Sequence, residues 1–512
     1  MAASVVSVGA SSSLVSASIR ATSKRLVGQI AAISASVVLV SLLAVIGKAW
    51  WDSRIPETYS VMSYGAHEYG GGPEPPNHEG HGGGTDVTDL HGPSEGEPDA
   101  RFELTARAAE LHLSSGRIVH ALTYNGVSPG PELRVRQGDL VEVVLRNDDV
   151  SEGVTIHWHG VDVPNAEDGV AGVTQNAVQP GQTYTYRFRA DQVGTFWYHT
   201  HQVSSQEVRR GLFGVIVIEP RDRQPGVDIA LAAHTFEGVP TLNGEEGGGR
   251  EKVPVGTPVR IRLVNTDSFE QMFTVSGTPF RVLAIDGADL HGPGELRNIA
   301  VPVAAGGRVD LGYVQPANGV RVAIEGTEVA LALGPSGGPA PGEVTPTSDF
   351  DPLTYGTPAP TPFDASSPFD RRFELEITRK PGFFDGTPGL QWAINGHIYP
   401  DVPVFVVEKG DLVQITLTND SNGIHPMHLH GHHLLVLSRD GQPSTGSPWW
   451  SDTLNVLKGE SYVVAFRADN PGIWMDHCHN LKHASQGLTM HVAYAGVSTP
   501  FLVGDEPGNR PE

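Results

Sequence analysis

A pattern made of a glycine turn, an alternating apolar segment and an asparagine-led turn occurs three times in the chain. Alternation with a period of two residues predicts β-strands, and the flanking Gly and Asn residues predict the turns that bound them. The copies begin at residues 136, 254 and 408, a spacing typical of domains and not of a solenoid repeat. We therefore expect three related β-domains, whose copies read RQGDLVEVVLRND (136–148), PVGTPVRIRLVNTD (254–267) and EKGDLVQITLTND (408–420).

The 61 glycines and 39 prolines favour short strands and tight turns over long helices, which both residues interrupt. Period-two strands separated by frequent turns are typical of β-sandwiches, in which two sheets face each other across an apolar core. The prediction is an all-β chain. Its expected domains are residues 101–222, 223–340 and 369–500, with a linker at 341–368 and a C-terminal tail at 501–512.

The N-terminal region contains an uncharged apolar stretch that is long enough to span a bilayer as a helix. Basic residues precede it and two tryptophans follow it, so the positive-inside rule predicts that everything after residue 51 is exported. We expect residues 1–51 to be a retained signal-anchor, because no good cleavage site follows the stretch. A cleaved secretion signal and an organelle transit peptide are the alternatives; the stretch is Leu26–Gly47, flanked by Arg20, Lys24, Arg25, Trp50 and Trp51.

Residues 52–100 are rich in Gly, Pro and acidic residues and nearly empty of aliphatic ones, which predicts a disordered linker. Solvated linker histidines are expected here, with loose metal capture as the alternative, at His67, His78, His81 and His91. The formal charge of −23 excludes nucleic acid as a natural partner, since phosphate binding depends on clustered Lys and Arg.

Histidines are concentrated in four short clusters, mostly as His-x-His pairs. On a strand, residues i and i+2 face the same way, so each pair presents two imidazoles on one side, as a metal chelate does. Scattered surface histidines would not be grouped in this way. The clusters hold 10 of the 22 histidines: His157 and His159; His199 and His201; His425, His428 and His430; and His477, His479 and His483.

The only cysteine, Cys478, lies between His477 and His479. Strand alternation turns these two histidines to one side and Cys478 to the other, so one tripeptide contacts two separate metal sites. One Cys with two His and a weak axial group is typical of a blue copper site, whereas structural zinc sites usually use more cysteines. We expect Cys478 to bind copper with His425 and His483.

The four motifs HWHG, HTH, HPMHLHGH and HCHNLKHASQGL resemble the four copper motifs of the multicopper oxidases, the family of laccases and bacterial metallo-oxidases. The resemblance covers about residues 101–498. It implies three cupredoxin-like Greek-key domains and four copper ions, and a monomer suffices because one chain carries both halves of the trinuclear cluster. The implied ligands are His425, Cys478 and His483 for type 1 copper; His157 and His428 for type 2; and His159, His199 and His479 with His201, His430 and His477 for the type 3 pair.

The resemblance also implies oxidation of a substrate one electron at a time at the type 1 copper. Four electrons then pass through Cys478 and its flanking histidines to reduce dioxygen to water. Water formation needs protons, and Asp168 lies where the family places an acid or relay after HWHG. Many relatives carry a second carboxylate just beyond the last type 1 histidine, whereas this chain has Ala484 and Ser485. Asp476 is a candidate substitute, although a structural aspartate at the end of a strand is the favoured interpretation of this residue.

The axial position of the type 1 site is predicted at Leu488, five residues after His483, with Met490 as the alternative. Leucine cannot coordinate copper, so relative to an axial Met it is expected to raise the reduction potential. Leu488 favours an oxidase of phenols and aromatic amines. The chain has only six methionines and no Met-rich segment that could gather Cu(I), which favours the same substrates. A metallo-oxidase of Fe(II), Mn(II) or Cu(I) is the alternative, ahead of a non-catalytic scaffold or copper store and of a nitrite reductase.

The substrate pocket over His483 depends on loops that the sequence does not place. Two roles stay open for four nearby residues, either lining of this pocket or core and turn positions: Trp449, Trp450, Trp474 and Asp452.

Overall fold

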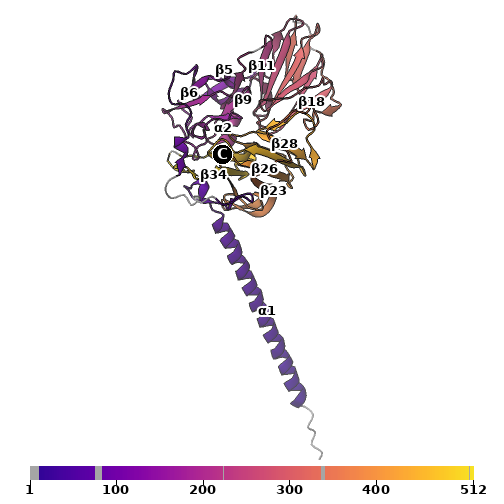
Figure 1. Ribbon diagram of the computed structural model, residues 1–512. Coiled ribbons are helices and arrows are strands. Elements are labelled where there is room, and N and C mark those ends of the chain that lie inside the picture. Colours follow the sequence, from indigo (N-terminus) through magenta and orange to yellow (C-terminus); the bar gives the residue numbers. More distant parts are fainter. Residues whose placement is uncertain (1–10, 75–83, 223, 336–340, 507) are drawn as a thin grey trace, which may run out of the picture. The chain divides into compact units, whose positions relative to one another are not determined.

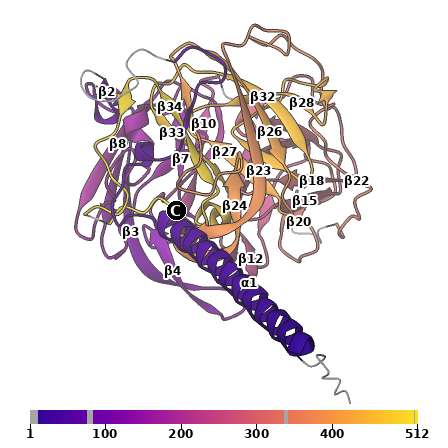
Figure 2. The ribbon, with the colours of Figure 1, turned by 90° about the horizontal axis from the view of Figure 1, so that it is seen from below.

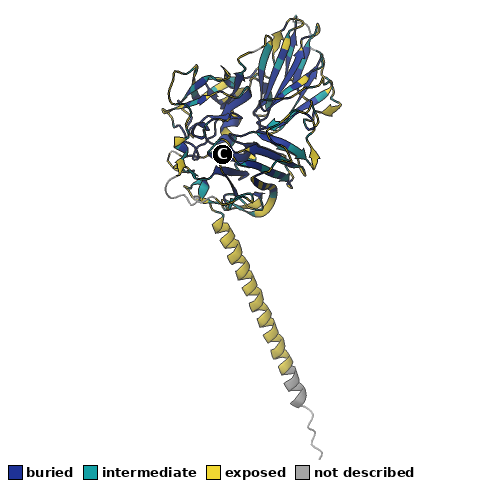
Figure 3. Ribbon diagram, in the orientation of Figure 1, coloured by how far each residue is buried: buried dark blue, intermediate teal, exposed yellow. Residues whose placement is uncertain are grey.

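The protein forms two compact units, Met1–Ile55 with Pro381–Leu390 and Pro56–Lys380 with Gln391–Glu512. The computed structural model describes residues 11–74, 84–222, 224–335, 341–506 and 508–512. In the first unit, α1 (Ser11–Asp52) is one continuous helix (Figure 1). Its segment Ser18–Asp52 has a mean hydropathy of 2.6 and is exposed (Figure 3), so by length and composition it is a candidate membrane span.

The second unit contains three β-sandwiches, each made of two sheets (Figure 1). In the first sandwich, one sheet has the order β4-β3-β6-β8, with bounds Ile118–Tyr124, Ala100–His112, Leu140–Asn147 and Thr183–Arg189. The facing sheet has the order β5-β10-β9-β7, with bounds Gly130–Arg136, Phe213–Glu219, Gly194–His199 and His157–His159.

The second sandwich has six strands in each sheet. One sheet is β12-β11-β14-β19-β16-β17, with bounds Val239–Leu242, Val227–Phe236, Pro258–Asn265, Arg308–Val314, Arg281–Ile285 and Ala288–Asp289. The other is β13-β21-β20-β15-β18-β22, with bounds Arg250–Lys252, Ala330–Gly334, Val320–Ile324, Gln271–Ser276, Ile299–Val303 and Ser348–Asp349. Strand β22 lies inside the expected linker at 341–368.

The third sandwich carries the histidine clusters of the second half of the chain. One sheet is β24-β23-β26-β32-β28-β29 with β30 paired to β28, with bounds Thr387–Ile394, Arg371–Phe384, Leu412–Asn419, Ser461–Arg467, Leu434–Arg439, Gln442–Pro443 and Trp450–Ser451. The other is β1-β25-β34-β33-β27-β31, with bounds His67–Glu68, Val404–Val407, Thr489–Tyr494, Ile473–Cys478, His425–Leu429 and Thr453–Val456.

The three copies of the sequence pattern form equivalent strands, β6, β14 and β26. Each strand follows a glycine whose φ is positive, a backbone conformation that would be strained in a residue with a side chain: Gly138, Gly256 and Gly410. Each ends at a fully buried asparagine whose side-chain amide donates to two backbone carbonyls: Asn147 to Val150 and Val178, Asn265 to Phe269 and Val303, Asn419 to Gly423 and Val456. The repeat therefore encodes one sandwich core three times.

Helices are short in the described part of the second unit. They are α2 (Ser204–Arg210), α3 (Leu481–Ala484) and the 3₁₀ turns η1 (Val61–Ser63), η2 (Val87–Asp89) and η3 (Asn165–Glu167). The strands bury Val, Ile, Leu and aromatic side chains between the sheets, and Figure 3 shows this as dark blue interiors. The all-β prediction is confirmed.

The expected disordered linker at 52–100 is wrong for most of the described residues within it. Strand β1 pairs with β25 of the third sandwich, and β2 (Thr85–Asp86) pairs with β35 (Val497–Ser498). Val61 and Val87 are buried in an apolar cluster with residues of the third sandwich. Backbone pairing with a distant strand supplies the order that composition did not indicate. His78 and His81 lie outside the described residues.

The first and third sandwiches meet where their histidines lie. In Figure 2, β7 of the first lies beside β27 and β33 of the third, and contacts between their side chains confirm the proximity. This arrangement brings both halves of the chain to one site.

Candidate metal centre

Two antiparallel strand pairs position most of the clustered histidines. In the first sandwich β7 pairs with β9, placing His157 opposite His199. In the third sandwich β27 pairs with β33, placing His428 opposite His477 and Met427 opposite Cys478. Directly opposed residues share a face of the sheet, so His428 and His477 project together while Cys478 projects from the other face.

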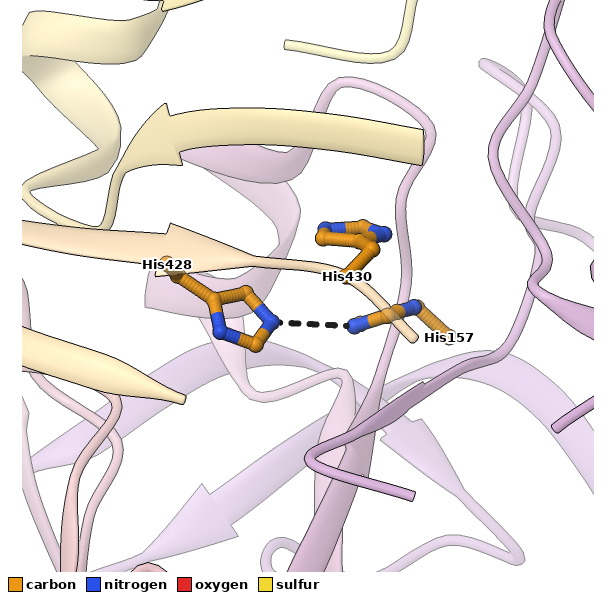
Figure 4. Close-up of side chains that lie close together, drawn as sticks. All are labelled: His157, His428 and His430. Carbon is orange, nitrogen blue, oxygen red and sulfur yellow. Dashed lines mark hydrogen bonds between the residues drawn. The ribbon is translucent and has the colours of Figure 1, made fainter. Parts of the chain in front are cut away.

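Eight buried histidines from the two sandwiches converge on one site. Nε2 of His157 lies 3.4 Å from Nε2 of His428, and the His157 ring stacks on that of His430 at 3.8 Å between centroids (Figure 4). Three groups made only of these histidines have ligand atoms close enough to share an ion: His157, His428 and His430; His157, His159 and His199; and His201, His430 and His477. A fourth group combines His159 and His428 with Asp452. His479 completes the set, with its ring 4.8 Å from that of His159 and 5.4 Å from that of His199.

Cys478 faces a second site. Its Sγ lies 3.6 Å from Nδ1 of His425 and 3.7 Å from Nδ1 of His483, and the thiol is fully buried. Continuing the register of β33 and β34 by one residue places Leu488 opposite Cys478, and the Leu488 carbonyl accepts from the Cys478 backbone N–H at 3.1 Å. Both Leu488 and Met490 are fully buried.

Burial keeps these imidazoles neutral, which is the form that binds metal. Desolvation lowers the pKa of His428 to about 4 and of His477 to about 3, and it lowers those of His425 and His483 to about 3 and about 4. Burial likewise raises the pKa of the Cys478 thiol, so its ionisation requires a cation beside it.

The donor set fits copper ions. Within the described ranges, several buried imidazole nitrogens have no hydrogen-bond partner, an arrangement that costs free energy unless a metal binds them. In the eight-histidine site they are Nδ1 of His159, Nε2 of His199, Nε2 of His201, Nδ1 of His477 and both ring nitrogens of His479.

Comparisons with known proteins agree with this geometry. Sequence profiles described as multicopper oxidase match residues 106–223 and 369–496. Laccase-1 of Botryotinia fuckeliana is 31% identical over 443 residues, which cover 72% of this chain and 77% of that protein. The chain belongs to the multicopper oxidase family. It is an oxidoreductase that contains copper and uses dioxygen as the electron acceptor.

Two further relatives show the range of the family. An iron transport multicopper oxidase of Kluyveromyces lactis is 26% identical and covers 72% of this chain and 72% of its own length. The crystal structure of a multi-copper oxidase from Pseudomonas thermotolerans superposes with a TM-score of 0.63 at 28% identity, covering 78% of this chain and all of that one.

Asp168 connects the two halves of the eight-histidine site in this oxidase. Its carboxylate lies 3.0 Å from Nδ1 of His430 and 3.0 Å from Nδ1 of His157, and its backbone carbonyl accepts from the same His157 nitrogen at 2.9 Å. The residue follows η3 and is fully buried. One side chain therefore orients rings from the first and third sandwiches.

Asp476 is not placed as a second carboxylate for the eight-histidine site. By strand alternation it projects from β33 on the same face as Cys478, away from His477. Burial raises its pKa to about 7. Asp476 therefore faces away from the eight-histidine site, which agrees with its favoured interpretation as a strand-end aspartate.

Of the two roles left open for Asp452, the structure shows the buried one. It is fully buried, its carbonyl accepts from Nδ1 of His428 at 2.9 Å, and its carboxylate lies 3.3 Å from Nε2 of His159. Arg308 of the second sandwich donates to both carboxylate oxygens at 2.6 and 2.5 Å. Trp474 is also fully buried, with its indole N–H bonded to the Asn470 carbonyl.

Replacing Arg308 by methionine is expected to destabilise the oxidase strongly. Arg308 is buried between Asp452 and Asp286, and the guanidinium holds the pKa of Asp452 well below its usual range against the opposing effect of burial. Removing one partner of a buried ion pair costs about 3–5 kcal/mol. Calorimetric unfolding measures this, with Arg297→Met, an exposed arginine of the same sandwich, as the control. Equal unfolding temperatures for both variants would contradict the expectation.

Sequence reasoning missed the surroundings of the Cys478 site. The Trp392 ring of β24 packs against His425 and His483, at 4.8 and 4.5 Å between centroids. The Arg379 guanidinium of β23 lies 4.0 Å above the Trp392 ring. Neither residue belongs to a motif, and only the pairing of β23 with β24 brings them to the metal ligands.

Proposed function

We propose that the protein is a laccase-like oxidase that removes single electrons from phenols and aromatic amines at a type 1 site formed by His425, Cys478 and His483. When bound, copper supplies one-electron acceptance at this site and four-electron reduction of dioxygen to water at the eight-histidine site. In this proposal Cys478 and the adjoining His477 and His479 form the covalent path between the two sites. Supporting it, one tripeptide faces both sets of ligands.

The assignment of individual histidines follows the family resemblance. One of its triplets, His201, His430 and His477, coincides with a group of close ligand atoms, and the pairs His159 with His199 and His157 with His428 each lie within another group. His157 and His428 hold the type 2 copper. The type 3 pair is held by two triplets that combine both sandwiches: His159, His199 and His479, and His201, His430 and His477. Leu488, opposite Cys478, occupies the axial position without coordinating, which favours a high reduction potential.

The observation that carries the choice of substrate is the charge around the type 1 ligands. After desolvation, the Arg379 guanidinium contributes to lowering the pKa of both His425 and His483, and Lys482 contributes to lowering that of His483. A positive rim attracts phenolates and repels metal cations. The Trp392 ring, which is buried beside both ligands, supports the Arg379 guanidinium at this rim.

The alternative is oxidation of Fe(II), Mn(II) or Cu(I), and one relative is named as an iron transport oxidase. The overall charge of −23 favours cation attraction in general. The local charge at His483 opposes it, because the two nearby charged groups that affect its pKa are cations.

Arg379→Glu tests this proposal. We expect kcat/KM for an anionic phenolic acid to fall by about tenfold and that for Fe(II) to rise, since electrostatic steering changes association rates by at least this factor. Oxygen uptake on both substrates provides the measurement. Arg372→Glu, an exposed arginine of the same strand, is the matched control for net charge. A wild-type protein that turns over Fe(II) and not phenols would refute the laccase-like assignment.

We also propose that the enzyme acts as a monomer outside the cytoplasm and that α1 anchors it to the membrane. One chain supplies all ten histidines and the cysteine, and α1 has the length and composition of a membrane span. Cleavage of the helix and secretion is the alternative. Recovery of the full chain, but not of residues 52–512, in a carbonate-washed membrane fraction supports the anchor, and a mature N-terminus beyond residue 51 rules it out.

A further inference from the structure

The last five residues of the chain lie against the eight-histidine site. The Glu512 carboxylate is 3.0 Å from Nδ1 of His477, and the Pro511 carbonyl accepts from Nδ1 of His201 at 3.1 Å. His201 and His477, with His430, form one of the close ligand groups. Asp168 lies 3.0 Å from Nδ1 of His430, so each of the three rings has its own oxygen atom within 3.1 Å of Nδ1.

We propose that residues 508–512 are a built part of the metal site, in which Pro511 and Glu512 are positioning residues for His201 and His477. The inference rests on the type 3 assignment made above. An acceptor at Nδ1 fixes the proton on that nitrogen and leaves Nε2 free to bind the ion. The segment thereby sets the tautomer of two of the three ligands.

Independent contacts hold this segment in place. The Gln202 side chain donates to the Gly508 carbonyl at 3.0 Å and accepts from the Arg510 backbone N–H at 2.8 Å. The Val203 N–H donates to the Arg510 carbonyl at 2.6 Å. Gln202 and Val203 directly follow His201, so the segment docks on the loop that supplies a metal ligand.

Asn509 anchors the segment to the first sandwich. It is fully buried, accepts from the Ala177 N–H at 2.9 Å and donates to the Leu502 carbonyl and to the Asn176 side chain at 2.9 and 2.8 Å. A buried amide with three hydrogen bonds specifies one backbone path. Residue 512 therefore reaches the site by a fixed route and not as a loose end.

Glu512 is held on its far side as well. The Ser204 hydroxyl of α2 donates to one carboxylate oxygen at 2.7 Å, while the other faces His477. Among the described residues, neither this second oxygen nor Nδ1 of His477 makes a hydrogen bond. The 3.0 Å contact between them is the nearest polar contact that each atom has, so each is placed to serve the other.

The experiment compares Glu512→Ala with the wild-type copper-loaded protein. We expect copper per chain to fall by about one ion, and the EPR-detectable share of the remaining copper to rise because a type 3 pair is disrupted. Oxygen uptake is expected to fall about 10- to 100-fold, the usual effect of losing a partner of a metal ligand. The blue thiolate band should persist, since Cys478 lies on the other face of β33.

Two further variants keep the result interpretable. Glu512→Gln retains an oxygen acceptor for His477 and should restore copper content, in part or fully, which a merely structural loss would not predict. Glu506→Ala removes an exposed carboxylate of the same tail and should change nothing. Full copper content and unchanged EPR in Glu512→Ala would overturn the inference. The proposed function would still hold in that case if phenols bleach the blue band of Glu512→Ala in the absence of oxygen, because the type 1 site then still accepts electrons from them.

Discussion

Cys478→Ser is expected to abolish both the blue absorption and oxygen uptake with every reductant. Serine nearly matches the shape of cysteine but offers a hard oxygen in place of a soft, polarisable thiolate, and copper selects the thiolate. Loss of a residue that hydrogen-bonds to a metal ligand lowers activity about 10- to 100-fold. Cys478 is itself a ligand and also connects the two copper sites, so its loss should lower activity more than about 100-fold. Copper per chain, absorbance and oxygen consumption measure the effect.

The matched control is Met490→Leu. Met490 is buried on the strand that pairs with β33, two residues beyond Leu488. If Leu488 occupies the axial position, this variant keeps its blue band and its reduction potential. A shifted potential would identify Met490 as the axial residue, and a blue Cys478→Ser protein would contradict the proposed site altogether.

The alternation of side chains between the two faces of a β-strand made much of the site predictable from the sequence. His-x-His spacing predicts paired imidazoles on one face, and the single Cys between two His predicts a residue that faces the other way. The register of β27 with β33 places His428 opposite His477 and Met427 opposite Cys478 in agreement with this reasoning. The repeated Gly-strand-Asn pattern likewise predicted the three sandwiches.

Contacts between segments distant in sequence were not predictable in this way. Arg308 reaches Asp452 across 144 residues and Ser204 reaches Glu512 across 308, and neither pair belongs to a periodic pattern. The linker prediction was wrong for a related reason. Composition measures how much apolar surface a segment has to bury, whereas β1 and β2 are ordered by pairing with strands that other parts of the chain supply.

Asp168→Asn is expected to slow oxygen reduction about 10- to 100-fold while leaving the oxidation of substrate intact. Asparagine keeps the shape of the side chain, and the backbone carbonyl still accepts from His157. It replaces the carboxylate beside His157 and His430 by an amide, which cannot take up and release a proton as a carboxylate does. Anaerobic reduction of the blue site and its aerobic reoxidation separate the two half-reactions.

Asp191→Asn, an exposed aspartate of the same sandwich, controls for the change in net charge. If Asp168 holds protons for water formation, the slowed reoxidation of Asp168→Asn should recover as the pH falls, because protons then arrive from solvent without it. If Asp168 only orients His157 and His430, copper content should fall and acid should bring no recovery. An equal loss in both half-reactions would argue against either role, since the Cys478 site lies on the opposite face of the sheet from the rings that Asp168 contacts.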